Sequence, residues 1–330
     1  MDIITIFKIY STITGVFGIF LNSILLYLAF FKSPSTLKSY SILIINFAIT
    51  DLLASVFTLI VMARLVPMST AIAQISYGFC IFFGPTYCYV GFSIMLHLFV
   101  FSQYCLLLSF SYRYYILENA SPKVRTVVYL IALFYIPALI HAACFMNGES
   151  DAREVMIIYQ KLYPNDTIVL NQVTGNLNTR TPTATFTVMH MILSPIPITI
   201  SILVIRRKII KQLEKTVKHL RKQTQALHKQ LLTALTIQAC LPAFFALGVV
   251  MFALEGAGIV MHPGIECIIS ASECIIPVLS PVLYLYFVSP YRRALLQITG
   301  IAPTVSTSDA SMTEHSTVVQ KEKGITSIHN

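Results

Sequence analysis

The sequence predicts an all-α membrane protein, a bundle of seven transmembrane helices, from its composition, its apolar runs and its basic residues. Of the 330 residues, 56% are hydrophobic and only 11% are charged, whereas a soluble domain carries about 25% charge. A helix needs roughly 20 apolar residues to cross the hydrocarbon of a bilayer. Seven runs are long enough, and we expect spans at about 6–30, 40–66, 83–110, 126–146, 183–205, 231–253 and 265–288.

Each of these runs must be helical, because backbone polar groups cannot stay unpaired in lipid. Prolines inside several runs would break a soluble helix, but membrane bundles tolerate them as kinks. We interpret Pro242 in the sixth run and Pro281 in the seventh as hinges. The chain shows no internal repeat, which argues against a transporter built from two inverted halves.

The basic residues predict that the N-terminus lies outside the cell, because cytoplasmic loops carry an excess of lysine and arginine. With that orientation, 18 of the 23 lysines and arginines fall on the cytoplasmic side, nine of them in the segment 206–230. The net charge of +9 therefore indicates topology and contact with anionic lipid rather than nucleic-acid binding. The sequon Asn165-Asp166-Thr167 follows the fourth run and is outside in this orientation, which predicts glycosylation at Asn165.

The domain organisation is expected to be simple: one membrane domain over residues 1–300 and a Ser/Thr-rich tail at 301–330. The tail is polar enough that we expect it to be disordered in the cytoplasm. Before it, residues 290–296 have the pattern of a short amphipathic helix on the inner leaflet. In the segment 206–230, apolar residues at helical spacing indicate extensions of the fifth and sixth spans, which suit docking of a protein partner. Its basic residues alone also fit a topological stop signal.

Asp51 lies in the middle of the second apolar run. A carboxylate at that depth costs about 3 kcal/mol on insertion scales, so it must face the bundle interior and find a polar partner or water. Asn22 in the first run and Ser280 in the seventh are the partners we expect. The group is either a polar switch or cation site, or a hydrogen-bonded hub that only holds the helices together.

Further polar residues interrupt the third and seventh runs. Glu273 and His97 are candidates for a ligand cavity, although Glu273 also fits a position near the outer surface. A histidine on an apolar helix is more often packed and hydrogen-bonded than in contact with a ligand. Arg113, between Tyr112 and Tyr114 at the cytoplasmic end, is either a positive-inside anchor among interfacial aromatics or a contact for a cytoplasmic partner.

Enzyme chemistry finds no support in the sequence. We see no Ser/His/Asp arrangement, no phosphate-binding loop and no metal-spaced cluster of cysteine or histidine. We therefore expect no catalytic activity, no cofactor and no metal.

Several of these features are typical of one kind of receptor when they occur together. They are seven spans, Asn22, the segment 46–53, the Tyr-Arg-Tyr sequence after the third span and the proline of the sixth. In this combination the chain resembles a seven-transmembrane G protein-coupled receptor, and more closely the nematode serpentine receptor class delta (srd) chemoreceptor family. The matching stretches cover most of the chain and include 40–43, 46–53, 78–80, 109–117, 230–239 and 287–292.

The resemblance implies a receptor that binds a small-molecule odorant or pheromone among the outer halves of its spans and signals to a heterotrimeric G protein. The residues implied to face the G protein are Tyr112, Arg113, Tyr114, Arg206 and Arg207. The sequence from Ser280 to Tyr284 resembles the Asn-Pro-x-x-Tyr motif, which adds Tyr284 to the polar switch. The family also implies a plasma-membrane location, by analogy in sensory cilia.

The chain also departs from rhodopsin-like receptors. No acid precedes Arg113, tryptophan is absent, and the loop at 147–182 contains no cysteine. The disulfide that such receptors form between the third span and this loop therefore cannot form here. We take a pairing of Cys80 with Cys144, near the outer end of the fourth span, as a hypothesis.

The alternative from another class is a seven-span ligand-gated channel or transporter. Insect-type odorant channels also have seven spans, but their N-terminus is inside. That orientation would put the basic segment 206–230 outside the cell and the Asn165 sequon in the cytoplasm. A structural or scaffolding membrane protein is a third reading.

Overall fold

The fold is taken from a computed structural model that describes residues 2–33, 38–68, 70–217, 233 and 236–298. The expected tail at 301–330 and most of the basic segment 206–230 lie outside the described residues.

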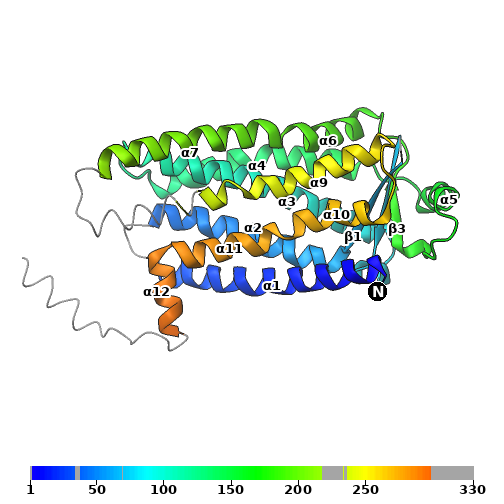
Figure 1. The fold of residues 1–330 in the computed structure, drawn as a ribbon, viewed down its shortest axis with the longest axis horizontal. Helices are drawn as coiled ribbons and strands as arrows, with labels where there is room; N and C mark the ends of the chain where they lie inside the picture. The colour runs from blue at the N-terminus through cyan, green and yellow to red at the C-terminus, as the bar shows by residue number, and fades with distance from the viewer. Residues whose placement is uncertain (1, 34–37, 69, 218–232, 234–235, 299–330) are drawn as a thin grey trace, which may run out of the picture.

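The described chain forms a bundle of long helices with a small sheet at one end (Figure 1). Within the described residues, seven helical segments are long and apolar enough to cross a membrane, so the seven-span all-α bundle is confirmed. Single helices form four spans: α1 Ile3–Phe31, α2 Lys38–Val61, α3 Pro85–Tyr115 and α4 Val124–Met146. The fifth span joins α6 Pro182–Leu193 to α7 Pro195–Val217, the sixth contains α9 Leu241–Gly256, and the seventh joins α10 Pro263–Cys274 to α11 Ile276–Phe287.

Proline explains the interruptions in two of the spans, because it has no N–H to continue the helical hydrogen bonds. Pro195 follows the break between α6 and α7, and Pro277 follows the break between α10 and α11. In the sixth span a turn at residues 239–240 interrupts the helix, and Pro242 lies in the first turn of α9 that follows; Pro281 lies inside α11.

The third span occupies the centre of the bundle. In its apolar window 78% of residues are buried, against 22% in the fourth span and 17% in the fifth. The outer helices turn apolar side chains outwards, as Tyr129 and Leu133 of α4 do. This is the pattern of a bundle whose solvent is lipid.

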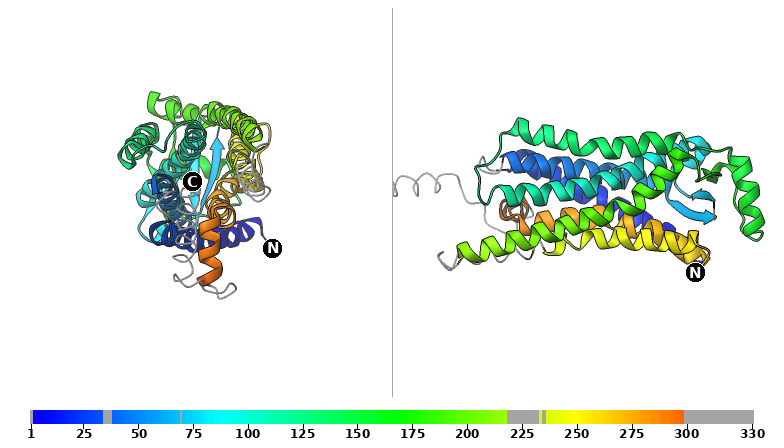
Figure 2. Two further views of the ribbon diagram at one scale, coloured as in Figure 1. Left: turned by 90° about the vertical axis from the view of Figure 1, so that its left-hand side faces the viewer. Right: turned by 90° about the horizontal axis from the view of Figure 1, so that it is seen from above.

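A cap closes one end of the bundle, and we use this name for the three strands and α5 together. Strands β1 Ala63–Met68, β2 Ala71–Ser76 and β3 Val173–Asn176 form an antiparallel sheet in the order β1-β2-β3. Helix α5, Ala152–Leu162, packs on β2 and β3. Figure 2 shows the cap at one end and α12, Ser289–Ile298, at the other.

The sheet begins where a helix was expected. The second run was predicted to be helical to about residue 66, but α2 ends at Val61. Met62 has a positive φ of 44°, which ends the helix because an L-residue cannot continue it there. The Tyr77 N–H then donates to the Val61 and Met62 carbonyls and closes the hairpin against the end of the helix.

The disulfide hypothesis was wrong. Cys80 pairs with Cys88, and Cys144 is a free thiol. A short helical turn at Phe79–Phe82 and a bend at Gly84 return the chain to the first turn of α3. This local turn sets the two Cα atoms 5.0 Å apart, within the range that a disulfide requires.

Candidate functional site

A cavity of about 700 Å³, its open mouth included, lies beneath the sheet of the cap. All three strands and helices α3, α4, α6, α9 and α10 contribute to its wall. The wall is largely apolar and aromatic, with Phe92, Phe145 and Phe252 among its side chains. Small-molecule sites are typically 300 to 1,000 Å³, apolar and fitted with a few polar groups.

Three polar side chains on this wall have unused hydrogen-bonding capacity: Glu273, Gln74 and His141, both of whose ring nitrogens have no partner among the described residues. Glu273 of α10 is 4% exposed, and its Oε1 has no hydrogen-bond partner among the described residues. Gln74 of β2 donates to Ser76 Oγ at 3.1 Å and to the Cys88 carbonyl at 3.4 Å. Its Oε1 is also unpaired within the described chain, so Glu273 and Gln74 both offer acceptors to a bound molecule.

The two residues expected to form a ligand cavity are not together on this wall. Glu273 lines the cavity, but His97 is not among the described residues that do so. The His97 ring instead packs edge-on against Tyr135 of α4, with ring centroids 5.1 Å apart. His141 of α4, which the sequence reasoning missed, lines the cavity in its place, and its ring lies 5.2 Å from that of His190.

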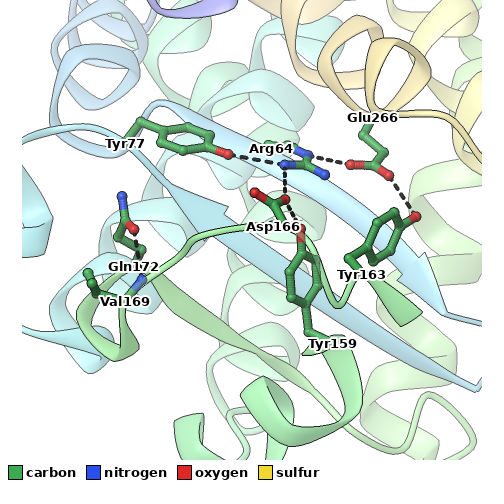
Figure 3. Close-up of polar contacts among 8 residues, drawn as sticks. All are labelled: Arg64, Tyr77, Tyr159, Tyr163, Asp166, Val169, Gln172 and Glu266. Atoms are coloured by element: carbon green, nitrogen blue, oxygen red, sulfur yellow. Dashed lines mark hydrogen bonds and ion pairs between the residues drawn. The ribbon is translucent and has the colours of Figure 1, made fainter. Parts of the chain in front are cut away.

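A buried ionic network ties the cap to the seventh span (Figure 3). Arg64 of β1 is 1% exposed; its Nε donates to Glu266 of α10, and its Nη1 donates to Asp166 at 2.9 Å. Its Nη1 also donates to the Tyr77 hydroxyl at 3.2 Å. Burial opposes the charge of Arg64, but Glu266 and Tyr77 outweigh that effect and raise the pKa of Arg64 above its ordinary value.

Two tyrosines complete the network from the segment after α4. The Tyr163 hydroxyl donates to Glu266 Oε1 at 2.8 Å, and the Tyr159 hydroxyl donates to Asp166. Burial, and then these hydrogen bonds to carboxylates, raise the pKa of both Tyr163 and Tyr159. The network therefore joins β1, α10 and the segment that carries Asp166, and it covers the cap end of the bundle.

Asp51 is fully buried in the middle of the bundle. Ser102 of α3 donates to its Oδ1 at 3.1 Å, and Ser280 of α11 is buried near the same carboxyl, whose Oδ2 has no hydrogen-bond partner among the described residues. Asn22 of α1 contacts a different group: its Nδ2 donates to the Pro277 carbonyl at 2.8 Å. Tyr284 packs edge-on against Phe47 of α2, with ring centroids 5.9 Å apart.

The contact from Asn22 has a simple cause in the seventh span. The Pro277 carbonyl would accept from the N–H of residue 281 in a regular helix, but Pro281 has none. The Asn22 amide supplies the missing donor from the neighbouring helix. Asn22 therefore holds α1 to α11, while Asp51 links α2 to α3.

At the α12 end, Arg113 bridges two spans. Its Nε donates to the Tyr40 hydroxyl at 2.8 Å, and its Nη1 donates to Gln238 Oε1 of the sixth span at 2.8 Å. The Tyr112 ring stacks on Tyr40 with centroids 5.5 Å apart. No acidic residue of the described chain pairs with Arg113.

The other residues expected to face a G protein lie at the same end. Lys208 sits over the Tyr114 ring, 5.7 Å from its centroid. Arg206 donates to Thr236 Oγ1 at 2.8 Å, and Arg207 is exposed. Nearby, Tyr291 fixes α12 through a 2.8 Å hydrogen bond with Ser33.

Comparison with known proteins identifies this architecture. The family model described as "Serpentine type 7TM GPCR chemoreceptor Srd" matches residues 7–297. The chain belongs to the Srd family. It is 38% identical to serpentine receptor class delta-18 of Caenorhabditis elegans over 297 residues, 88% of this chain and 87% of that one. It is 35% identical to serpentine receptor class delta-19 of the same organism over 302 residues, 89% of this chain and 88% of that one.

Membership establishes the general character of this Srd receptor. It is a multi-pass membrane protein with a seven-transmembrane chemoreceptor role. Its family is one of receptors and not of enzymes. The match reaches into all seven spans, so the cavity and the α12 end both lie within it.

Proposed function

We propose that this Srd receptor binds a small molecule in the cavity beneath the cap and transmits that binding to a heterotrimeric G protein at the α12 end. The observation that carries the proposal is the cavity itself, which is largely apolar and contains the buried carboxyl of Glu273, whose Oε1 has no hydrogen-bond partner among the described residues. The helices on its wall include α3, α6 and α9, and α3 and the fifth and sixth spans also reach the α12 end. A ligand that binds one arrangement of these helices more tightly would increase the population of that arrangement, and with it the corresponding conformation at the α12 end.

The proposed orientation puts the N-terminus and the cap outside the cell and α12 in the cytoplasm. Asn165 is exposed at the cap end, as a glycosylated residue must be. Arg113, Arg206 and Arg207 then lie on the cytoplasmic side with the basic segment. We infer no catalytic activity and no cofactor, and we place the receptor in the plasma membrane, with sensory cilia as the family-based location.

Arg113 is the residue on which we propose to test coupling. Its partners Tyr40 and Gln238 are neutral, so relative movement of α2 and the sixth span can release the guanidinium without breaking an ion pair. We expect Arg113→Ala to reduce ligand-driven G-protein activation, and Arg207→Ala, at an exposed position, to have a smaller effect. Neither variant should abolish surface expression.

The experiment is a ligand screen in cells that express the receptor with a calcium or cyclic-nucleotide reporter. The same hits are then applied to the two arginine variants, with surface amounts matched by an epitope tag. Unchanged responses in both variants would count against coupling through this end. Ligand-gated current that persists when G proteins are blocked would support a channel instead.

A further inference from the structure

The charge balance of the cavity points to the chemistry of its ligand, an inference that rests on the proposed function because it concerns the same site. Glu273 is the one carboxylate among the described lining residues, and lysine and arginine are absent from that set. The Arg64 side chain is not on this wall and is already shared between Glu266 and Asp166. Glu273 therefore has no cationic partner within the described protein.

Close packing of α9 and α10 positions the backbone that carries Glu273. Glu273 lies in the last turn of α10, and α9 packs closely against this helix at Gly248. A Cβ at Gly248 would come within 2.6 Å of Ser272 Oγ and 2.8 Å of the Ile269 carbonyl. The two helix backbones are therefore in close contact next to Glu273, which fixes the position of its Cα at the wall.

The other lining residues indicate the chemical character of the part of the ligand that does not contact Glu273. Phe92, Leu96, Phe145, Phe252 and Ile269 present hydrocarbon and aromatic faces, which favour an apolar body. Aromatic faces also attract cations. An isolated buried carboxylate is unfavourable unless a charge or a hydrogen-bond donor meets it.

We propose that the cavity binds a hydrophobic amine, whose ammonium group pairs with Glu273 while its apolar body packs against Phe92, Phe145 and Phe252. A neutral alcohol of the same shape would fill the same space. It would lack the charge that complements the carboxylate, and hydrogen bonds between charged partners are roughly twice as strong as neutral ones.

The test uses the full-length receptor purified in lipid nanodiscs, without any G protein. Two matched pairs serve as probes: 2-phenylethylamine with 2-phenylethanol, and 4-phenylbutylamine with 4-phenylbutan-1-ol. Binding is measured by the rise in melting temperature across a concentration series. We expect each amine to bind at least about tenfold more tightly than its alcohol.

Glu273→Gln should remove this preference, weakening amine binding at least about tenfold and leaving alcohol binding unchanged. Its melting temperature without ligand should be equal to that of the wild type or higher, because a buried unpaired charge is gone. Glu154→Gln on the exposed face of α5 is the matched control, and it should leave all four probes unaffected.

Equal binding of amine and alcohol by the wild type, or no amine binding at all, would overturn the proposal. So would an amine preference that survives Glu273→Gln. The wild-type comparison does not depend on the variant folding. Amines that bind through Glu273 but activate no G protein would leave this inference standing and count against the proposed function instead.

Discussion

Arg64 and Glu266 form a buried ion pair although 202 positions separate them in the sequence. The two side chains are 1% and 0% exposed. Arg64 stands on the hairpin that follows the second span, and Glu266 stands in the first turn of the seventh. The pair therefore fixes the cap over the cavity, and Asp166 adds the segment before β3 to the same contact.

Breaking this pair from one side should destabilise the receptor strongly. Arg64→Met leaves Glu266 buried without its partner, which we expect to cost about 3 to 5 kcal/mol. The double variant Arg64→Met with Glu266→Leu removes both charges and should recover much of the loss. Thermal unfolding of the purified receptor measures both changes.

The matched control for the pair is Arg153→Met, because Arg153 is exposed on α5 and surface substitutions shift stability by only about 0.5 kcal/mol. A double variant no more stable than Arg64→Met would show that the pair does not act as a unit.

The tyrosines of the network predict a loss of stability at alkaline pH. Their pKa is raised in the folded protein, by burial first and then by their carboxylate partners. An unfolded tyrosine loses its proton near pH 10, so above that pH the unfolded chain binds fewer protons than the folded one. The free energy of unfolding then falls as pH rises, while below pH 10 this contribution is fully present.

Melting temperatures between pH 8 and pH 11 measure the effect. Tyr163→Phe should flatten the alkaline decline, because phenylalanine does not titrate. Tyr87→Phe, at a tyrosine that is 65% exposed, should leave the slope as in the wild type. An identical slope in Tyr163→Phe would exclude this tyrosine as its source.

The hydrogen bond from the Asn22 amide to the Pro277 carbonyl should make a measurable contribution to the stability of the receptor. Asn22→Leu leaves the Pro277 carbonyl buried without a donor, which we expect to cost about 1 to 3 kcal/mol. Pro281→Ala would supply a backbone N–H to the same carbonyl and should reduce that cost in the double variant. A double-mutant cycle on melting temperature measures the coupling, and additive effects would refute the explanation.

Much of this architecture was predictable from the sequence because lipid restricts the choices. Apolar length and low charge give seven helices, since only paired backbone can cross the bilayer. An acid such as Glu273 in an apolar run is conspicuous for the same reason. The family resemblance rests on local motifs and is confirmed by the match over residues 7–297.

The cap was not predictable, because it depends on long-range contacts. The apolar pattern alone predicted that the second span continues to about residue 66. Arg64 within that stretch was a signal against this, because a charged side chain is costly in lipid. Arg64 can be buried there because it pairs with Glu266 and Asp166. No local sequence pattern shows that these two residues lie close to it. The Cys80–Cys88 disulfide was missed because analogy favoured a distant partner over a local turn.

The chain has a second sequon, Asn119-Ala120-Ser121, which the proposed orientation puts in the cytoplasm. This sequon and the one at Asn165 offer a direct test of orientation, because they lie at opposite ends of the bundle. Asn165 lies in the segment between α5 and β3 at the cap end, and Asn119 follows α3 at the α12 end. Both side chains are exposed, so only the membrane side decides which one is glycosylated.

Thr167→Ala removes the sequon at Asn165 and keeps Asp166, which the Arg64 network needs. We expect it to abolish the mobility shift caused by deglycosylation on gels, and Asn119→Gln to leave that shift intact. The reverse result would place the cap in the cytoplasm and refute the proposed orientation.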